Sequence, residues 1–336
     1  MTGRRLVRVG GAALLGAVLL VSTAGPAAAA RTVTELALLR DMAYAWPSDI
    51  NAGGIAVGGS GNNNGAQFAV RWDTDGSAAN LGTLPGAESS YAAGINDSGV
   101  IVGRADDRAV VWRTDGTMTE LPGLDGYSNI EAIGVNNSGM VIGHAWDRFT
   151  GAHRGVSWRE DGTVLELDLL PEADGSYVED INADGYAVGE LYSPSFQDRA
   201  VLWHPDGTVK ELDVLPGHVA SQARGINRHR AIVGNSTGPD GLVHAVRWNP
   251  DGSVVDLGTP DGAYSSYAQD INDKGVAVGF TQTMDGDRAL HWSAYGAITD
   301  LDAGPASARG INIKGTIIGV GGSGSGADRG LRWALA

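Results

Sequence analysis

Residues that could carry chemistry are present in this sequence, but they do not stand at catalytic or metal-binding spacings. Two acid-rich stretches, WDTDG and TMDGDR, lack the alternating acids of a calcium loop. No nucleophile elbow or paired-carboxylate motif stands out. The histidines show no spacing typical of zinc ligands; they are His144, His153, His204, His218, His229, His244 and His291. We therefore expect no metal, no cofactor and no catalytic residue.

Arginine recurs four residues before a tryptophan, and this set could face an anionic ligand. Its members are Arg108, Arg154, Arg199, Arg288 and Arg329. The competing interpretation is structural, because a guanidinium group suits several hydrogen bonds to loop carbonyls or carboxylates. We retain Arg108, Arg199 and Arg288 as candidate ligand-binding residues.

Aromatic residues form the second candidate set. Trp146, Phe149, Tyr192 and Phe196 follow no repeat and fall in long, variable loops. Such residues suit stacking on sugar rings or holding a peptide. Other aromatic residues share one position, five before a recurrent Asn, which favours packing; they are Trp46, Tyr91, Tyr177 and Tyr267. The four non-periodic residues are therefore the main candidates for a binding site.

These candidates are placed by a repeat that occurs seven times. DINDKGVAVG at residues 270–279 returns six times in variant form, and a tryptophan keeps step with it. The repeat asparagines are Asn51, Asn96, Asn136, Asn182, Asn227, Asn272 and Asn312. Their separations of 40 to 46 residues are typical of a solenoid, a propeller or an array.

Each repeat reads as four short strands. In the sixth they are SSYAQDIN, GVAVGF, DRALHW and AITDL, runs with β-branched or aromatic content between turn residues. Asn and Gly in NDSG or NDKG suit a type I turn, and Asp-Gly pairs predict a second hairpin. We expect the recurrent Asn to be turn residues and the periodic Trp to fill the space between sheets.

The chain ends predict how the repeats are arranged. The seventh repeat stops after its third strand, while Thr32–Leu39 matches the fourth strand of other repeats. Pairing the two ends closes a ring and leaves no free sheet edge between first and last repeats. The sequence therefore predicts an all-β, seven-bladed β-propeller over residues 31–336, with its last blade shared by both termini.

These motifs resemble the HAF-repeat family of bacterial extracellular repeats, named for a His-Ala-Phe signature between the IN..G..VG element and a Trp. The best local match is HAVRW at His244–Trp248, and most other copies hold Arg in place of His. The resemblance covers Thr32 to the C-terminus. It implies export and a repeat fold, and it supplies no activity and no catalytic residues.

The N-terminus and composition predict the location and exclude some partners. Residues 1–30 combine three arginines, an apolar run from Val9 to Val21 and GPAAAA, the pattern of a secretory signal peptide. Export by the general or the twin-arginine route is open. Removing them changes the net charge from −15 to −18. Such an acidic, cysteine-free chain does not favour nucleic acid or anionic lipid. We expect a secreted monomer without membrane insertion.

Two main functional hypotheses follow. The leading one is a non-enzymatic propeller that binds an extracellular glycan or protein on its variable-loop face. The alternative is an extracellular lyase or hydrolase that acts on a polysaccharide or other polymer, with acids and histidines gathered at the channel mouth. For that alternative the first candidates are His144, His153 and His218. An interaction module without a small-molecule pocket is a third possibility.

Overall fold

The computed structural model describes residues 32–159, 161–193, 196–322 and 328–335, except for the side chains of residues 196, 302 and 303. Within these ranges the protein is all-β, with 27 strands and no helix. It follows that no described helix is long and apolar enough to cross a membrane. Residues 31–335 form one compact unit. The expected signal peptide lies outside the described residues.

Five antiparallel sheets have four strands each, in sequence order. The first contains β2 (Tyr44–Ile50), β3 (Ala56–Gly61), β4 (Gln67–Trp72) and β5 (Ala78–Asn80). The second contains β6 (Ser90–Ile95), β7 (Ile101–Ala105), β8 (Arg108–Trp112) and β9 (Met118–Glu120). The third contains β10 (Asn129–Val135), β11 (Val141–Trp146), β12 (His153–Trp158) and β13 (Val164–Glu166). The fourth contains β14 (Gly175–Ile181), β15 (Ala187–Ser193), β16 (Phe196–Trp203) and β17 (Val209–Glu211). The fifth contains β18 (Ala220–Ile226), β19 (Ile232–Thr237), β20 (Val243–Trp248) and β21 (Val254–Asp256).

The sixth sheet has seven strands and joins the two chain ends. Its order is β1-β27-β26-β25-β24-β23-β22. The strands are β22 (Ala263–Ile271), β23 (Ala277–Thr283), β24 (Gly286–Trp292), β25 (Ile298–Ile311), β26 (Thr316–Gly321), β27 (Arg329–Ala334) and β1 (Thr32–Glu35). The first part of β25 pairs with β24 and the last part pairs with β26. β1 pairs with β27, Val33 opposite Trp333, and it is shorter than the expected strand Thr32–Leu39.

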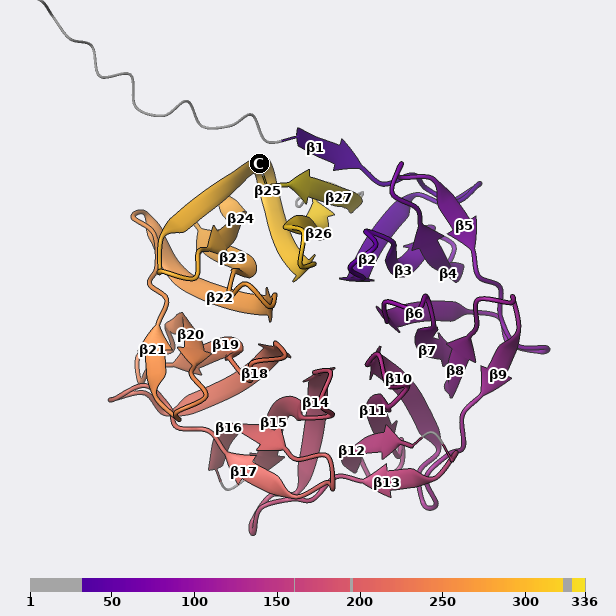
Figure 1. Cartoon of the computed structure of the whole chain (residues 1–336), viewed down its shortest axis with the longest axis horizontal. Coiled ribbons are helices and arrows are strands. Elements are labelled where there is room, and N and C mark those ends of the chain that lie inside the picture. The colour runs from indigo at the N-terminus through magenta and orange to yellow at the C-terminus, as the bar shows by residue number, and fades with distance from the viewer. Residues whose placement is uncertain (1–31, 160, 194–195, 323–327, 336) are drawn as a thin grey trace, which may run out of the picture. The chain divides into compact units, whose positions relative to one another are not determined.

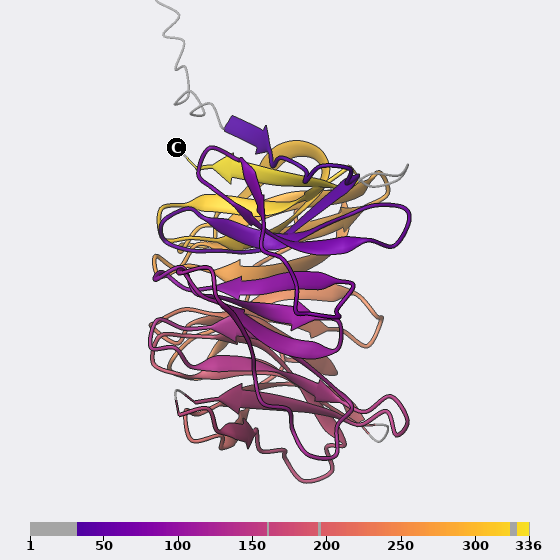
Figure 2. The ribbon, with the colours of Figure 1, turned by 90° about the vertical axis from the view of Figure 1, so that its right-hand side faces the viewer.

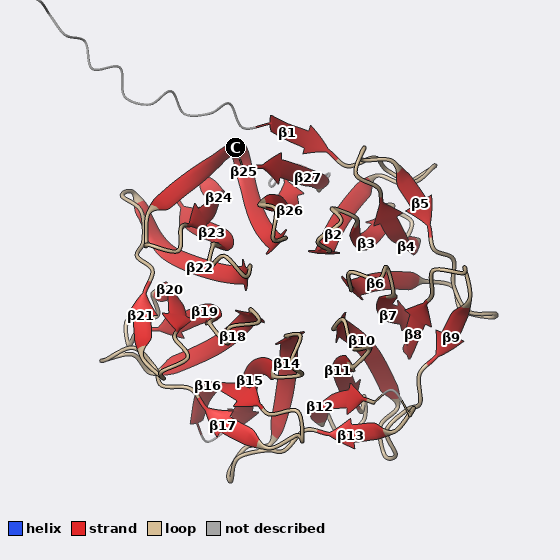
Figure 3. Ribbon diagram, viewed as in Figure 1, coloured by secondary structure: helices blue, strands red, loops and turns tan. Residues whose placement is uncertain are grey.

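The sheets stand radially around a central axis, with their first strands innermost (Figures 1 and 3). Figure 2 shows the same unit from the side, with the sheets following one another around it. This is the arrangement of a β-propeller. We call the end where the innermost strands begin the variable-loop end, because it carries the loops between second and third strands and the connections between sheets.

A tryptophan fills the space between each repeat and the next. The described core falls into seven clusters, each of which contains one repeat tryptophan. Trp158, for example, packs against Val102 and Ala109 of the preceding repeat. The Trp248 indole N–H also donates to the carbonyl of Asp213, at 2.6 Å. The expected packing role of the periodic tryptophans is confirmed by their burial.

The innermost strand of every repeat carries a β-bulge three residues before the repeat Asn. In β14 the pairing shifts between Val178 and Asp180, which leaves Glu179 as the extra residue. The bulge pushes a carbonyl toward the next strand, so that a Cβ added at Gly189 would lie 2.0 Å from the Tyr177 oxygen. The corresponding glycines are Gly58, Gly103, Gly143, Gly234, Gly279 and Gly319. The last Gly of the IN..G..VG motif is therefore required by the bulge.

The repeat asparagines close a ring of hydrogen bonds. Each Nδ2 donates to the backbone carbonyl of the next repeat Asn, at 3.1–3.2 Å. The last of these bonds runs from Asn312 to Asn51. Each Oδ1 also accepts the amide four residues on, as from Tyr186 to Asn182 at 3.0 Å. The turn role expected for these residues is therefore correct, and the same amides join neighbouring repeats.

The bulge leaves no room for a side chain at Gly189, and this can be tested. We expect Gly189→Ala to lower the free energy of unfolding by roughly 2–4 kcal/mol, because the new methyl group would overlap a fixed backbone oxygen. Gly123→Ala is the matched control, since a Cβ there meets nothing within 4 Å, and it should change stability by less than about 1 kcal/mol. Urea unfolding measures both. Equal stability of the two variants would contradict the steric explanation.

Candidate functional site

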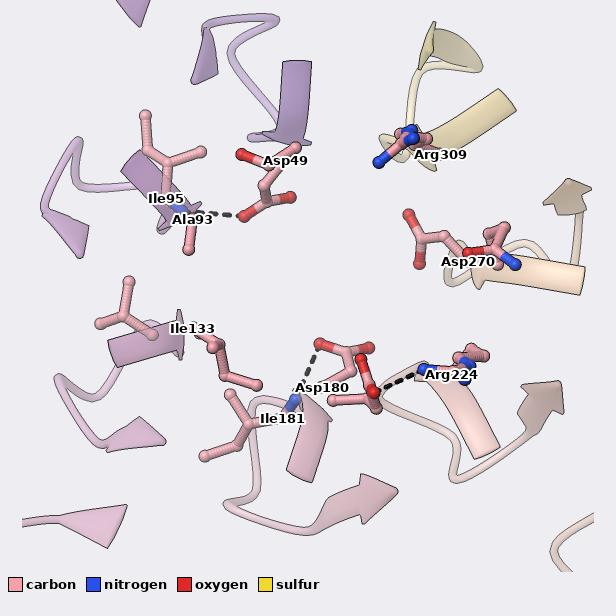
Figure 4. A pocket seen from close by; sticks show the side chains of 14 residues that line it. Asp49, Ala93, Ile95, Ile133, Asp180, Ile181, Arg224, Asp270 and Arg309 are labelled. Carbon is pink, nitrogen blue, oxygen red and sulfur yellow. Dashed lines mark hydrogen bonds and ion pairs between the residues drawn. The ribbon is translucent and has the colours of Figure 1, made fainter. Parts of the chain in front are cut away.

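The seven bulge residues line the central channel, and their side chains include hydroxyl, apolar, acidic, amide and basic groups. They are Ser48, Ala93, Ile133, Glu179, Arg224, Gln269 and Arg309, around a cavity of about 370 Å³ (Figure 4). One side of the ring is small or apolar, and the other carries charges and an amide. Because the bulge aims a side chain away from the ladder, this position can vary without disturbing the fold.

Three aspartates in the channel wall join neighbouring repeats. Asp270 accepts the amide of Ile271 at 2.6 Å on one carboxylate oxygen and the amide of Ile311 at 2.7 Å on the other. Asp49 and Asp180 make the same pair of bonds to their own and the following repeat. The following repeat has Gly at the equivalent position in each case. Each aspartate therefore bridges two repeats and also lines the channel.

Burial raises the pKa of all three aspartates despite these bonds. The pKa of Asp49 rises to about 6 and that of Asp270 to about 7. The pKa of Asp180 rises well above its ordinary value, through burial first and the charge of Asp270 second. Burial penalises the charged form, and the repulsion between carboxylates across the channel adds to it.

At the variable-loop end, an arc of titratable side chains begins at Arg104. Its guanidinium lies 3.5 Å from Glu131, whose other oxygen lies 3.7 Å from Nδ1 of His144. Nε2 of His144 lies 2.7 Å from the carbonyl of Val178 in the next repeat. Burial alone would raise the pKa of Glu131, but His144 and Arg104 lower it. Burial alone would lower the pKa of His144, but Glu131 and Glu179 raise it.

The arc continues through Arg224. Its guanidinium pairs with Glu179 at 2.5 Å and lies 3.7 Å from Glu190. Glu190 is 7% exposed, and its Oε1 accepts a hydrogen bond from Gln222 at 3.2 Å, while Oε2 has no hydrogen-bond partner among the described residues. Burial raises the pKa of Glu190 to about 7, against the opposing charge of Arg224. The pKa of Glu131 is thus lowered from its ordinary value, and the pKa of Glu190 is raised.

A side cavity opens from the channel between the fifth and seventh repeats. Its volume is about 410 Å³, and it shares Arg224, Gln269 and Arg309 with the channel. Tyr267 and Phe280 form part of its wall, with their rings stacked at 4.8 Å. Burial raises the pKa of Asp287, which also lines it. Apolar rings with a few converging polar groups are typical of small-ligand sites.

Two of the four aromatic candidates join one cluster at the arc. Trp146 stacks on His153 with ring centroids 6.2 Å apart, and Tyr192 lies 5.4 Å from Tyr177. Tyr177 contacts both His153 and His144, and it belongs to the periodic set that sequence reasoning assigned to packing. Phe149 is 86% exposed on the loop after β11. The side chain of Phe196 lies outside the described residues. A ligand role for the four stays a prediction.

The candidate arginines do not join the channel group. Arg108, Arg199 and Arg288 lie on third strands of separate sheets. Each pairs with an acid twelve residues on, at 3.3, 2.9 and 3.4 Å respectively, in or beside the fourth-strand segment; the partners are Glu120, Glu211 and Asp300. These ion pairs agree with the structural role considered for the arginines. Ligand binding by these arginines stays a prediction.

Sequence reasoning did not select most of the channel residues. The available signal was the position three before each repeat Asn, which differs in almost every copy while its neighbours hardly change. Among the histidines, His144 and His153 lie in the arc region, whereas His218 contacts His244 in another part of the molecule. Over the described residues, no group of three or more His, Cys, Asp or Glu is placed to hold a metal ion.

Comparisons with known proteins confirm the β-propeller fold. No protein-family model matches the sequence, and no curated protein matches it. Among solved structures, virginiamycin B lyase from Staphylococcus aureus has a TM-score of 0.60 and 14% identity, covering 91% of this chain and 100% of its own. Puromycin hydrolase has a TM-score of 0.59 and 14% identity, covering 89% and 55%. The acylaminoacyl peptidase from Pyrococcus horikoshii has a TM-score of 0.58 and 13% identity, covering 86% and 51%.

These comparisons correct the leading functional hypothesis. The expected non-enzymatic binding propeller is contradicted, because the similar structures are a lyase, a hydrolase and a peptidase. The alternative hypothesis, an enzyme of the lyase or hydrolase class, is kept as a proposal. At these identities the likeness shows the fold alone, so the chemistry must come from the channel residues themselves.

The raised pKa values predict how stability depends on pH. A carboxyl group with a raised folded-state pKa stabilises the fold below its unfolded pKa, and that contribution is lost as pH rises through the folded pKa. Because the values for Asp49 and Asp270 are about 6 and about 7, the free energy of unfolding should be about 4 kcal/mol lower at pH 8 than at pH 5. Urea unfolding across this range measures it.

Substitution distinguishes the effect of these aspartates from that of other groups whose pKa values are also raised, such as Glu190. Asp270→Asn should lower stability at pH 5, since one backbone amide loses its acceptor, and should also reduce the fall between pH 5 and pH 8. Asp125→Asn, at an exposed turn position, is the control and should leave the pH dependence unchanged. Stability that rises from pH 5 to pH 8 in the unsubstituted protein would contradict the prediction.

Proposed function

We propose that this protein is an extracellular enzyme, a lyase or hydrolase that cleaves a polysaccharide or other polymer at the variable-loop end of its channel. The observation that carries the proposal is the pair Glu131 and Glu190, which lie in one connected arc and whose pKa values are shifted in opposite directions. Two carboxyl groups separated in this way by their surroundings are suited to act as base and acid.

Each titratable group of the arc has a proposed role in the reaction. Glu131 is ionised beside His144 and Arg104, so it is the base that takes a proton from water or from the substrate. Glu190 holds a proton up to about neutral pH and supplies it to the departing oxygen. His144, whose pKa Glu131 and Glu179 raise against the effect of burial, and Arg224 stabilise the negative charge that develops during bond cleavage.

We further propose that the unit is a seven-bladed ring of the HAF-repeat type. The seven asparagine hydrogen bonds and the seven tryptophan clusters support seven blades, as does β25, which divides its pairing between two strands. On this interpretation the seven-stranded sheet is two blades joined through β25, and β1 completes the last one. Secretion after removal of residues 1–30 is part of the same proposal, as is action on an extracellular glycan or protein by a monomer.

The acid–base assignment predicts the behaviour of two variants. Glu190→Gln should lower kcat on the cleaved polymer by about a hundredfold or more and remove the fall in rate above pH 7. Glu131→Gln should lower kcat to a similar extent and remove the fall in rate on the acidic side. Release of soluble fragments from neutral and acidic polysaccharides, peptidoglycan and protein substrates identifies the polymer and measures the rates.

Glu166→Gln is the control, because Glu166 pairs with Arg154 at 2.8 Å in an outer ion pair between third and fourth strands. It should keep the rate and the pH profile of the unsubstituted protein. Retention of full activity by both the Glu131 and Glu190 variants would overturn the assignment. The absence of soluble fragments from every polymer would overturn the proposed activity.

A further inference from the structure

We infer that the side cavity is a subsite for a sugar ring that carries a carboxylate, so that the polymer contains uronate units. The inference rests on the proposed function and names its substrate class. It depends on Arg309, on the aromatic wall of the side cavity and on the aspartates of the channel wall, none of which the acid–base assignment uses.

Arg309 is a charged side chain whose donors are not used by the fold. It is exposed, projects from its bulge into the channel, and makes no hydrogen bond or ion pair with the described part of the chain (Figure 4). The other arginines of this end are held by acids, Arg104 by Glu131 and Arg224 by Glu179. A guanidinium group with free donors matches the two oxygens of a carboxylate.

The same cavity offers an apolar wall for the ring that bears this carboxylate. Tyr267 and Phe280 line it together with Arg309 and the amide groups of Gln222 and Gln269. Aromatic rings cover the apolar face of a sugar, and the Gln269 amide can bond its hydroxyl groups, whereas the Gln222 amide donates to Glu190 and Asp198. The cavity volume of about 410 Å³ lies within the range of about 300–1,000 Å³ that is usual for small-ligand sites.

The aspartates of the channel wall favour a ligand with one negative charge over a ligand with two. Asp49 and Asp270 line the channel together with Arg309, and their carboxylates are occupied by backbone amides rather than by the arginine. Above about pH 7, where both are ionised, they offset part of the positive charge of Arg309. A phosphate or sulfate-rich group would meet stronger repulsion here than a carboxylate does.

Arg224 connects this subsite with the reacting groups. It lines the side cavity and also contacts Glu179 and Glu190 of the arc. A polymer with one uronate ring at Arg309 would extend past Arg224 toward Glu190.

The inference is tested by binding, which does not need turnover. Titration of the full protein with glucuronate and galacturonate, followed by calorimetry, should show binding at least tenfold tighter than that of glucose and galactose. Arg309→Gln should weaken uronate binding by about tenfold to a hundredfold, and Arg309→Lys should fall between. Arg113→Gln, on an exposed arginine of a different turn, is the control and should bind as the unsubstituted protein does.

The outcomes separate this inference from the proposed activity. Equal binding of neutral and acidic sugars, or unchanged uronate binding by Arg309→Gln, would overturn the inference. Cleavage of a neutral polymer that does not depend on Arg309 would also overturn it while leaving the enzyme proposal in place. Uronate binding through Arg309 without cleavage of any uronate polymer would support the subsite and overturn the activity.

Discussion

The ring of asparagine hydrogen bonds is the constraint on which the rest of this structure depends. Each amide works twice, since Oδ1 holds its own turn and Nδ2 reaches the carbonyl of the next repeat. An aspartate could accept the turn amide but has no N–H to donate, which explains why Asn never changes among the seven copies. Because Asn312 bonds Asn51, the described unit closes on itself at the channel as well as through the pairing of β1 with β27.

The bulge next to this ring separates the framework from the site. The glycine opposite it cannot change, since any Cβ would overlap a backbone oxygen, whereas the bulged residue itself lines the channel. Residues as different as Ala93, Glu179 and Arg309 therefore occupy equivalent positions. Function can change here at small cost in stability, because the contacts common to all seven repeats are made by the asparagines and tryptophans and not by the bulge residues.

Most of the fold could be predicted from the sequence, because its determinants are local or periodic. Turn asparagines, Asp-Gly hairpins and the tryptophan period gave the strands, and the match of Thr32–Leu39 to other fourth strands gave the terminal pairing, although β1 ends at Glu35. The site could not be predicted in the same way. Glu131 and Glu190 come from different repeats, and their pKa values arise from His144 and from burial near Arg224, contacts that have no signature in linear spacing.

Charge also limits what this mouth can accept. The net charge of −15 repels a polyanion at long range, so an acidic polymer would associate slowly at low salt and faster when the repulsion is screened. Inside the mouth the balance is local: Arg104 and Arg224 are neutralised by their acids, whereas Arg309 pairs with no acid among the described residues. Specificity would then come from the contact between Arg309 and a ligand carboxylate. The surrounding negative charge would repel anionic ligands that cannot make this contact. A neutral ring gains no ion pair with Arg309, and a dianion meets more repulsion from ionised Asp49 and Asp270 than a monoanion does.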